Sequence, residues 1–223
     1  MRLADRLRPQ TLADVIGQPV TRHLAAWLAQ PDSRCFLFEG GPGVGKTSAA
    51  LALAADLGSV DECSGLYLVP CSEFSIDVAR SLFEGNERHG PVMRQRHIEG
   101  RGWNVLVLEE LEWLSPQTVR YLKVALDDTR RPPRCVVVAT SNDASALDKA
   151  LRQRFDVYRF GAGKTFADAC AARLAEIWCD ETGQASLPAG WTAWGWDGED
   201  FSLRLALQAL ERSARLMPQG VAA

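Results

Sequence analysis

One octapeptide limits what this chain can fold into more than any other feature. Residues 40–47 read Gly-Gly-Pro-Gly-Val-Gly-Lys-Thr, a complete match to the pattern G-x-x-x-x-G-K-[ST]. Apolar residues 35–38 precede it, and residues 46–57 follow with a helical pattern that Gly58 closes. A buried strand that turns through glycines into a helix directs backbone N–H groups and the positive end of the helix dipole at one point. The sequence therefore predicts a strand, a phosphate-binding loop and a helix.

Residues of this loop have separate expected roles. The Lys46 ammonium should reach the β- and γ-phosphates of ATP, and the Thr47 hydroxyl should bind Mg²⁺. The expected cradle for the cofactor consists of Gly41, Pro42, Gly43, Val44, Gly45, Lys46, Thr47 and Ser48. The alternative is a glycine-rich turn that binds nothing, and the strand and helix on either side of the loop argue against it.

A second acidic element follows another apolar run. Residues 105–108 read as a buried strand, and Glu109 and Glu110 come directly after it. Carboxylates at the carboxyl end of a parallel strand face the ligand crevice. We therefore expect Glu109 to hold Mg²⁺ together with Thr47, and Glu110 to polarise the attacking water. Solvated acids at a strand end are the alternative.

The rest of the chain alternates in the same way. Residues 66–69, 136–139 and 157–160 are predicted strands, and helices are expected between them. This alternation predicts an α/β fold with a five-stranded parallel sheet flanked by helices. After Gly161 the pattern becomes helical, at 165–182 and 202–216. We expect residues 1–161 to form the nucleotide-binding core and residues 162–223 to form a small helical lid.

Composition excludes several classes of protein. The chain of 223 residues is 47% hydrophobic and 24% charged, as in globular proteins, so a disordered tail or a fibre is excluded. Six cysteines without a C-x-x-C pair indicate reduced thiols, and we found neither a signal peptide nor an apolar run of about 18 residues. These features predict a cytoplasmic protein with no membrane partner.

The charge pattern is less decisive. The formal net charge of −3 excludes a global field that attracts nucleic acid. Segments 80–101 and 120–134 nevertheless carry an excess of arginine and could contact DNA phosphates. Solvated helix faces with Arg–Asp pairs are the alternative.

Together these motifs resemble AAA+ ATPases of the clamp-loader clade, and the chain is similar to replication factor C small subunits and bacterial clamp-loader motor subunits. Residues 6–18 resemble the N-terminal segment of that family, and residues 139–142 resemble its sensor 1. Residues 150–155 resemble the stretch that carries its arginine finger, and residues 204–208 resemble its sensor 2 helix.

The resemblance implies further site residues. The adenine base would lie against Arg8, Pro9, Ile16 and Gly17. Asn142 would lie beside the γ-phosphate and the attacking water. Arg154 would reach the ATP of a neighbouring subunit, whereas Arg204 would reach the γ-phosphate of its own.

The resemblance also implies partners and a role. They are other AAA+ subunits in a pentamer or hexamer, DNA, and a sliding clamp. The implied role is DNA replication or repair, in which ATP hydrolysis loads or remodels a DNA-bound protein. Two alternatives stay open: a branch-migration or fork-remodelling ATPase, and a weakly hydrolysing assembly switch that recruits partners.

The sequence departs from the family pattern at a few positions. Glu109 stands where the family usually has Asp, and its longer side chain favours slow hydrolysis. Phe155 follows Arg154 where clamp loaders often have Cys, and Arg204 lies farther from Gly198 than in the usual GDLR motif. The resemblance ends with the lid, so we expect no C-terminal collar domain.

Overall fold

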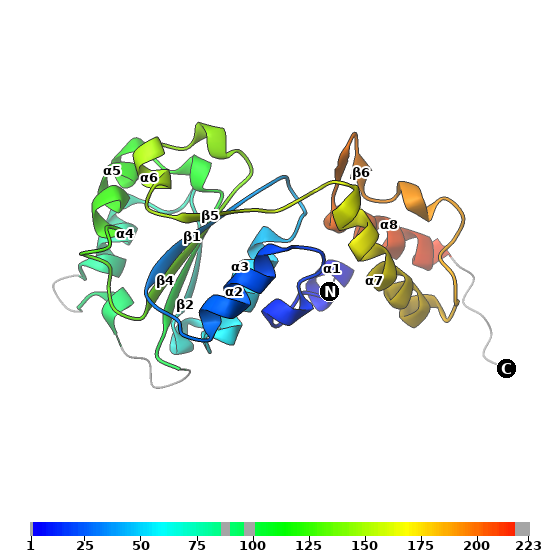
Figure 1. The fold of residues 1–223 in the computed structure, drawn as a ribbon, viewed down its shortest axis with the longest axis horizontal. Helices are drawn as coiled ribbons and strands as arrows, with labels where there is room; N and C mark the ends of the chain where they lie inside the picture. Colours follow the sequence, from blue (N-terminus) through cyan, green and yellow to red (C-terminus); the bar gives the residue numbers. More distant parts are fainter. Residues whose placement is uncertain (1, 86–89, 96–100, 217–223) are drawn as a thin grey trace.

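The computed structural model describes residues 2–85, 90–95 and 101–216. Five parallel strands form one sheet in the order β2-β3-β4-β1-β5 (Figure 1). Their bounds are β1 Arg34–Glu39, β2 Leu66–Pro70, β3 Asn104–Glu109, β4 Cys135–Ser141 and β5 Asp156–Arg159. The predicted α/β class with a five-stranded parallel sheet is confirmed.

The three central strands β1, β3 and β4 are buried on both faces of the sheet. Because side chains alternate along a strand, Phe36 and Phe38 of β1 pack on one face, and Cys35 and Leu37 pack on the other. Helices α2 (Val20–Leu28) and α3 (Lys46–Asp56) cover the first face. Helices α4 (Ile76–Phe83), α5 (Pro116–Ala125) and α6 (Lys149–Arg152) cover the second (Figure 1). The result is a three-layer core.

Two helices of this core begin with a serine that caps the first turn. The Ser75 hydroxyl accepts a hydrogen bond from the backbone N–H of Val78 at the start of α4. The Ser115 hydroxyl does the same for Thr118 in α5, where proline occupies the first turn. Each bond satisfies a backbone donor that lacks a partner inside the helix.

The lid contains two main helices, α7 (Lys164–Thr182) and α8 (Leu203–Leu216). Gly183 ends α7 with a φ of 71°. The lid also contains an element that the sequence did not predict, a short antiparallel hairpin of β6 (Trp196–Asp197) and β7 (Asp200–Phe201). Its turn includes Gly198 with a φ of 63°, and the ring centroids of Trp196 and Phe201 lie 5.5 Å apart.

The N-terminal residues join the two parts of the molecule. Helix α1 (Leu3–Arg6) packs on α8, and Arg6 forms an ion pair with Glu181 of α7.

The short 3₁₀ helices are η1 Leu12–Asp14, η2 Glu62–Ser64, η3 Val92–Arg94, η4 Leu111–Trp113, η5 Ala144–Ala146 and η6 Trp191–Ala193. None of the helices in the described part of the chain is long and apolar enough to cross a membrane.

Candidate nucleotide-binding site

The glycine-rich loop connects β1 to α3 at the carboxyl edge of the sheet. Gly43 and Gly45 have φ angles of 77° and 97°, which residues with a Cβ rarely adopt. A cavity of about 300 Å³ lies against this loop. Its lining consists of Pro42, Gly43, Gly45, Lys46, Thr47, Ser48, Pro70, Ser72, Glu109, Glu110, Thr140, Asn142 and Arg204. Residues from the loop, from three strand ends and from the lid therefore meet at one cavity.

Lys46 is buried at this cavity. Its ammonium donates hydrogen bonds to the carbonyls of Gly40 and Gly41, both at 2.7 Å, and to Oδ1 of Asn142 at 2.9 Å. Burial lowers the pKa of Lys46 to about 8, although the nearby Glu112 carboxylate acts in the opposite direction. The ammonium is thus held by neutral oxygens, which a phosphate could replace.

The two acids of the β3 edge take different positions. The Thr47 hydroxyl donates to Oε1 of Glu109 at 2.9 Å, so the two groups predicted to hold Mg²⁺ are in direct contact. Glu110 has a left-handed backbone with a φ of 58°, and its N–H donates to the Thr140 hydroxyl at 3.1 Å. Such strained backbone is concentrated at functional sites.

A hydroxyl and a carboxylate suit Mg²⁺, which keeps several waters and is completed by substrate phosphates in sites of this kind. Within the described residues, no group of three or more His, Cys, Asp or Glu forms a separate metal cluster. Thr47 and Glu109 would therefore hold the ion together with the nucleotide.

Asn142 connects the two halves of the site. Its amide oxygen accepts from Lys46, and its amide nitrogen lies 3.4 Å from Oε1 of Glu110. The sequence interpretation missed the residue that holds Asn142: Glu112, whose Oε1 accepts from the Asn142 backbone N–H at 3.0 Å. Its other oxygen is buried without a hydrogen-bond partner among the described residues. The available signal was the third acid in the pattern Glu-Glu-x-Glu at 109–112.

A second cavity, of about 580 Å³, adjoins the first and shares Gly45 and Ser48 with it. Its lining includes Arg8, Pro9, Ile16, Val44, Phe166 and Ile177. Most of this lining is apolar, which suits a flat aromatic base. Gly17 does not line this cavity; it lies against α7, where an added Cβ would be 2.9 Å from Cβ of Ala169.

The lid touches the loop directly. The backbone N–H of Leu203, at the start of α8, donates to the Gly43 carbonyl at 3.1 Å. A Cβ at Gly43 would lie 2.0 Å from the Ser202 hydroxyl, so this approach requires glycine. Arg204 thereby reaches the phosphate cavity, despite its unusual spacing in the sequence.

Arg154 lies away from this cavity. Its Nη2 is 3.2 Å from Oδ2 of Asp127, and its Nε donates to the Lys123 carbonyl at 3.2 Å, near the end of α5. It lines a separate polar cavity of about 420 Å³ that also includes Arg34, the first residue of β1. Arg154 therefore does not face the phosphate cavity of its own chain.

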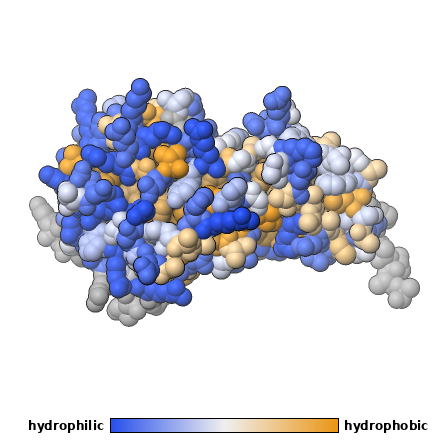
Figure 2. Space-filling model, in the orientation of Figure 1, coloured by the Kyte–Doolittle hydropathy of each residue, from blue (hydrophilic) through white to orange (hydrophobic). Residues whose placement is uncertain are grey.

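The arginine-rich segments are only partly accounted for. Arg88, His89, Arg96 and His97 lie outside the described residues. In segment 120–134, the Arg131 side chain is 8% exposed and forms an ion pair with Asp128. Hydrophilic side chains dominate the visible face of the α/β core in Figure 2, whereas the visible face of the lid is more mixed.

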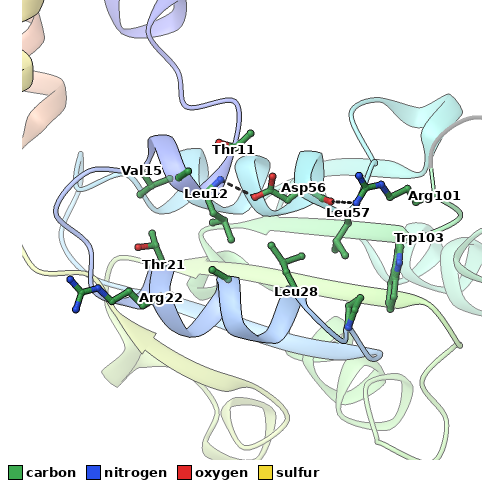
Figure 3. Close-up of a pocket in the computed structure, with 13 residues that line it drawn as sticks. Thr11, Leu12, Val15, Thr21, Arg22, Leu28, Asp56, Leu57, Arg101 and Trp103 are labelled. Atoms are coloured by element: carbon green, nitrogen blue, oxygen red, sulfur yellow. Dashed lines mark hydrogen bonds between the residues drawn. The ribbon is translucent and has the colours of Figure 1, made fainter.

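A larger cavity, of about 770 Å³, lies between η1, α2 and the end of α3 (Figure 3). It contains none of the predicted site residues. Leu12, Leu28 and Leu57 line it, and Asp56 at its rim accepts hydrogen bonds from the Leu12 N–H at 2.9 Å and from Arg101 at 3.2 Å. Its size alone does not make it the functional site.

The strand order, the glycine loop after β1 and the acids after β3 together define a P-loop NTPase. Residues 36–166 match the family model described as "ATPase family associated with various cellular activities (AAA)". The chain belongs to this family.

Curated relatives support the predicted clamp-loader resemblance. The replication factor C small subunit of Methanocella arvoryzae is 30% identical over 159 residues, which is 70% of this chain and 47% of that protein. The small subunit of Archaeoglobus fulgidus is 28% identical over 215 residues, which is 95% of this chain and 63% of that protein. The chain thus spans 47–63% of the length of these relatives.

Solved structures agree on the fold. The Thermotoga maritima RuvB Holliday junction branch migration motor superposes with a TM-score of 0.67 and 19% identity, covering 94% of this chain and 66% of that one. At this identity the likeness concerns the fold alone. The predicted membership of the clamp-loader-like AAA+ ATPases is confirmed by the family match and the curated relatives.

Proposed function

We propose that this chain binds ATP with Mg²⁺ at the phosphate cavity and hydrolyses it to ADP and phosphate. The observation that carries the proposal is the meeting of Lys46, the Thr47–Glu109 pair, Glu110 and Asn142 at one cavity. These are a charge for the phosphates, oxygen ligands for the metal, a base and an orienting amide, which phosphoryl transfer to water requires.

Each residue has a defined role in this proposal. Lys46 exchanges its carbonyl partners for the β- and γ-phosphates, and Arg204 adds a second positive charge from the lid. Glu110 accepts a proton from the attacking water, while Asn142, held between Lys46 and Glu110, orients that water. Bound Mg²⁺ supplies charge neutralisation on the phosphate oxygens.

The adenine base of ATP binds in the adjoining apolar cavity. Arg8, Pro9 and Ile16 line it, and Gly17, with a φ of 66°, directly follows Ile16. Because the two cavities share Gly45 and Ser48, one nucleotide would occupy both, with its phosphates at the loop.

We further propose that the chain acts within an oligomer of AAA+ subunits. Arg154 would reach the γ-phosphate of a neighbour, which is supported by its position away from its own phosphate cavity. The target would be a DNA-bound protein such as a sliding clamp, in replication or repair. Support for this target comes from the relatives named replication factor C subunits.

The test measures phosphate release from ATP by the purified chain without DNA, with primed DNA and with branched DNA. The proposal predicts Mg²⁺-dependent turnover that is faster with DNA and is lost in Glu110→Gln. Preference for branched DNA would favour the branch-migration alternative. Absence of turnover despite ATP binding, at every DNA and protein concentration, would refute the hydrolysis proposal.

One observation favours the assembly switch as a second candidate. The Glu109 carboxylate reaches the Thr47 hydroxyl directly, so its longer side chain occupies space that a shorter aspartate would leave to a metal-bound water. If this contact slows hydrolysis, Glu109→Asp should raise the turnover rate without changing ATP affinity. An unchanged or lower rate would count against the switch.

A further inference from the structure

Gln18 is a buried amide at the junction of three segments. The residue is only 3% exposed to solvent. Nε2 donates to the carbonyls of Val44 and Gly161, both at 3.1 Å, and Oε1 accepts from the N–H of Gly161 at 3.0 Å. Both amide hydrogens and the amide oxygen are therefore used. Val44 belongs to the phosphate loop, and Gly161 lies between β5 and the lid.

The bond to Val44 fixes part of the phosphate loop. A peptide group is planar and trans, so a carbonyl and the following N–H point in opposite directions. Holding the Val44 carbonyl thus orients the N–H of Gly45 away from Gln18. In the same way, the bond from Leu203 to the Gly43 carbonyl orients the N–H of Val44. Two successive peptide groups of the loop are thus held through their carbonyl oxygens, one by Gln18 and one by the lid.

The bonds to Gly161 fix the connection to the lid. Gln18 satisfies both backbone groups of this residue, and the next carbonyl, of Ala162, accepts from the N–H of Phe201 at 2.5 Å. The preceding residue, Gly17, is packed against Phe166 and Ala169 of α7. Residues 17 and 18 therefore contact the lid helix, the linker and the phosphate loop at once.

We propose that Gln18 is a positioning residue that couples the phosphate loop to the linker between core and lid. If nucleotide binding moves the Val44 carbonyl, Gly161 must move with it, because the same planar amide is hydrogen-bonded to both. The lid then moves with the loop. The role of nucleotide in this coupling rests on the proposed function, whereas the tether to Gly161 does not.

The chain offers its own pair of probes. Cys63 in the core and Cys179 in the lid are exposed, and the other four cysteines are buried. Spin labels on these two thiols give the core-to-lid distance distribution by pulsed electron paramagnetic resonance. Affinity for a fluorescent ATP analogue is measured on the same samples.

A matched control is available at the amino-terminal end of the strands, at the opposite end of the sheet from the phosphate loop. Asn104, at the start of β3, is 2% exposed, and its amide donates to the carbonyls of Met93 at 3.3 Å and Gln95 at 2.9 Å. Gln18→Met and Asn104→Leu each remove a buried amide and keep most of the side-chain volume. Both should lower stability by similar amounts, because each leaves backbone groups unpaired.

We expect Gln18→Met to broaden the distance distribution and to weaken analogue binding about tenfold relative to Asn104→Leu. If Gln18→Met fails to fold, Gln18→Glu keeps the acceptor for Gly161 but loses both donors, and it should weaken binding similarly. Equal widths and affinities for the Gln18 and Asn104 variants would overturn the proposal. A wild type that binds no analogue, together with broadening in Gln18→Met, would refute the proposed function and leave the tether supported.

Discussion

Nζ of Lys46 lies 2.9 Å from Oδ1 of Asn142, although 96 residues separate them in the sequence. The strand order explains the contact. β1 and β4 are parallel neighbours, with Glu39 opposite Ser141 in register. The loop and helix after β1 therefore start at the same carboxyl edge of the sheet at which Asn142 follows β4. β3 pairs with the other side of β4 and brings Glu110 to the same place. One parallel sheet thus brings together the groups that we propose to bind phosphate and metal and to orient water.

The first prediction concerns pH. Burial lowers the pKa of Lys46 to about 8 in the free protein, and phosphates bind its protonated form. ATP affinity should therefore be independent of this group below about pH 7 and should fall above pH 8, by up to about tenfold per pH unit. Calorimetric titration in two buffers of different ionisation enthalpy should show proton uptake in this range.

The same pKa shift has a sign for stability. Because the pKa of Lys46 is lower in the folded chain than the ordinary 10.5, the unfolded chain binds more protons between about pH 8 and 10.5. The contribution of this group to the free energy of unfolding should rise across that window. Lys46→Arg, which stays protonated, should remove both effects. Identical pH profiles for the two proteins would contradict the assignment.

The second prediction separates the two acids. Glu110→Gln should leave ATP affinity nearly unchanged and reduce turnover about 10²–10⁴-fold, because glutamine keeps the shape but accepts no proton. Glu109→Gln should instead raise the Mg²⁺ concentration needed for half-maximal activity, because it weakens the oxygen ligand next to Thr47. Mg²⁺ titrations of ATPase activity measure both. If Glu109→Gln alone stopped turnover at saturating Mg²⁺, the roles would be reversed.

The third prediction concerns Arg154. If it acts on a neighbour's ATP, turnover per molecule should rise with protein concentration, and Arg154→Ala should lower it by about a thousandfold. Its ion pair with Asp127 would then be exchanged for phosphate on assembly. As a purely structural surface pair, it would contribute about 1 kcal/mol or less to stability and nothing to turnover.

Mixing provides the control for this arginine. A Lys46→Ala subunit keeps Arg154, and an Arg154→Ala subunit keeps its phosphate loop, so the mixture should recover part of the activity. Turnover that is independent of dilution, with a mixture as inactive as its components, would rule out action between copies of this chain.

The fourth prediction concerns the residue before the loop. Glu39 is buried, and its carboxylate accepts from Arg152 at 2.8 Å, with Arg159 farther away at 3.8 Å. Arg152→Ala should leave this carboxylate poorly paired and lower the free energy of unfolding by about 2 kcal/mol, because Arg152 is itself partly exposed. Urea denaturation measures the loss. Adding Glu39→Gln should restore part of it, and a loss below about 0.5 kcal/mol in the single variant would mean that solvent replaces the arginine.

Local patterns were sufficient to predict most of the core. The runs at 105–108 and 136–139 are apolar on both faces, as buried parallel strands must be, and each ends within one or two residues of the prediction. The loop at 40–47 carries its conformation in its glycines, so its place between β1 and α3 could be read directly.

Contacts between distant segments could not be predicted in this way. Gln18 and Glu112 act through backbone groups of Val44, Gly161 and Asn142, and a backbone carbonyl or N–H has no signature in the sequence. The lid hairpin was missed because two-residue strands are too short to show alternation. Arg204 reaches the loop because α8 begins beside Gly43, a tertiary contact that sequence spacing did not suggest.

The most direct test is calorimetric titration of ATP with Mg²⁺ into the wild type and Lys46→Ala at pH 7. The account predicts saturable binding of one nucleotide per chain in the wild type. It predicts at least about tenfold weaker binding in Lys46→Ala, since a charged hydrogen-bonding partner of the phosphates is lost. Equal affinity in the two proteins, both folded by circular dichroism, would show that the cavity at the glycine-rich loop is not the nucleotide site.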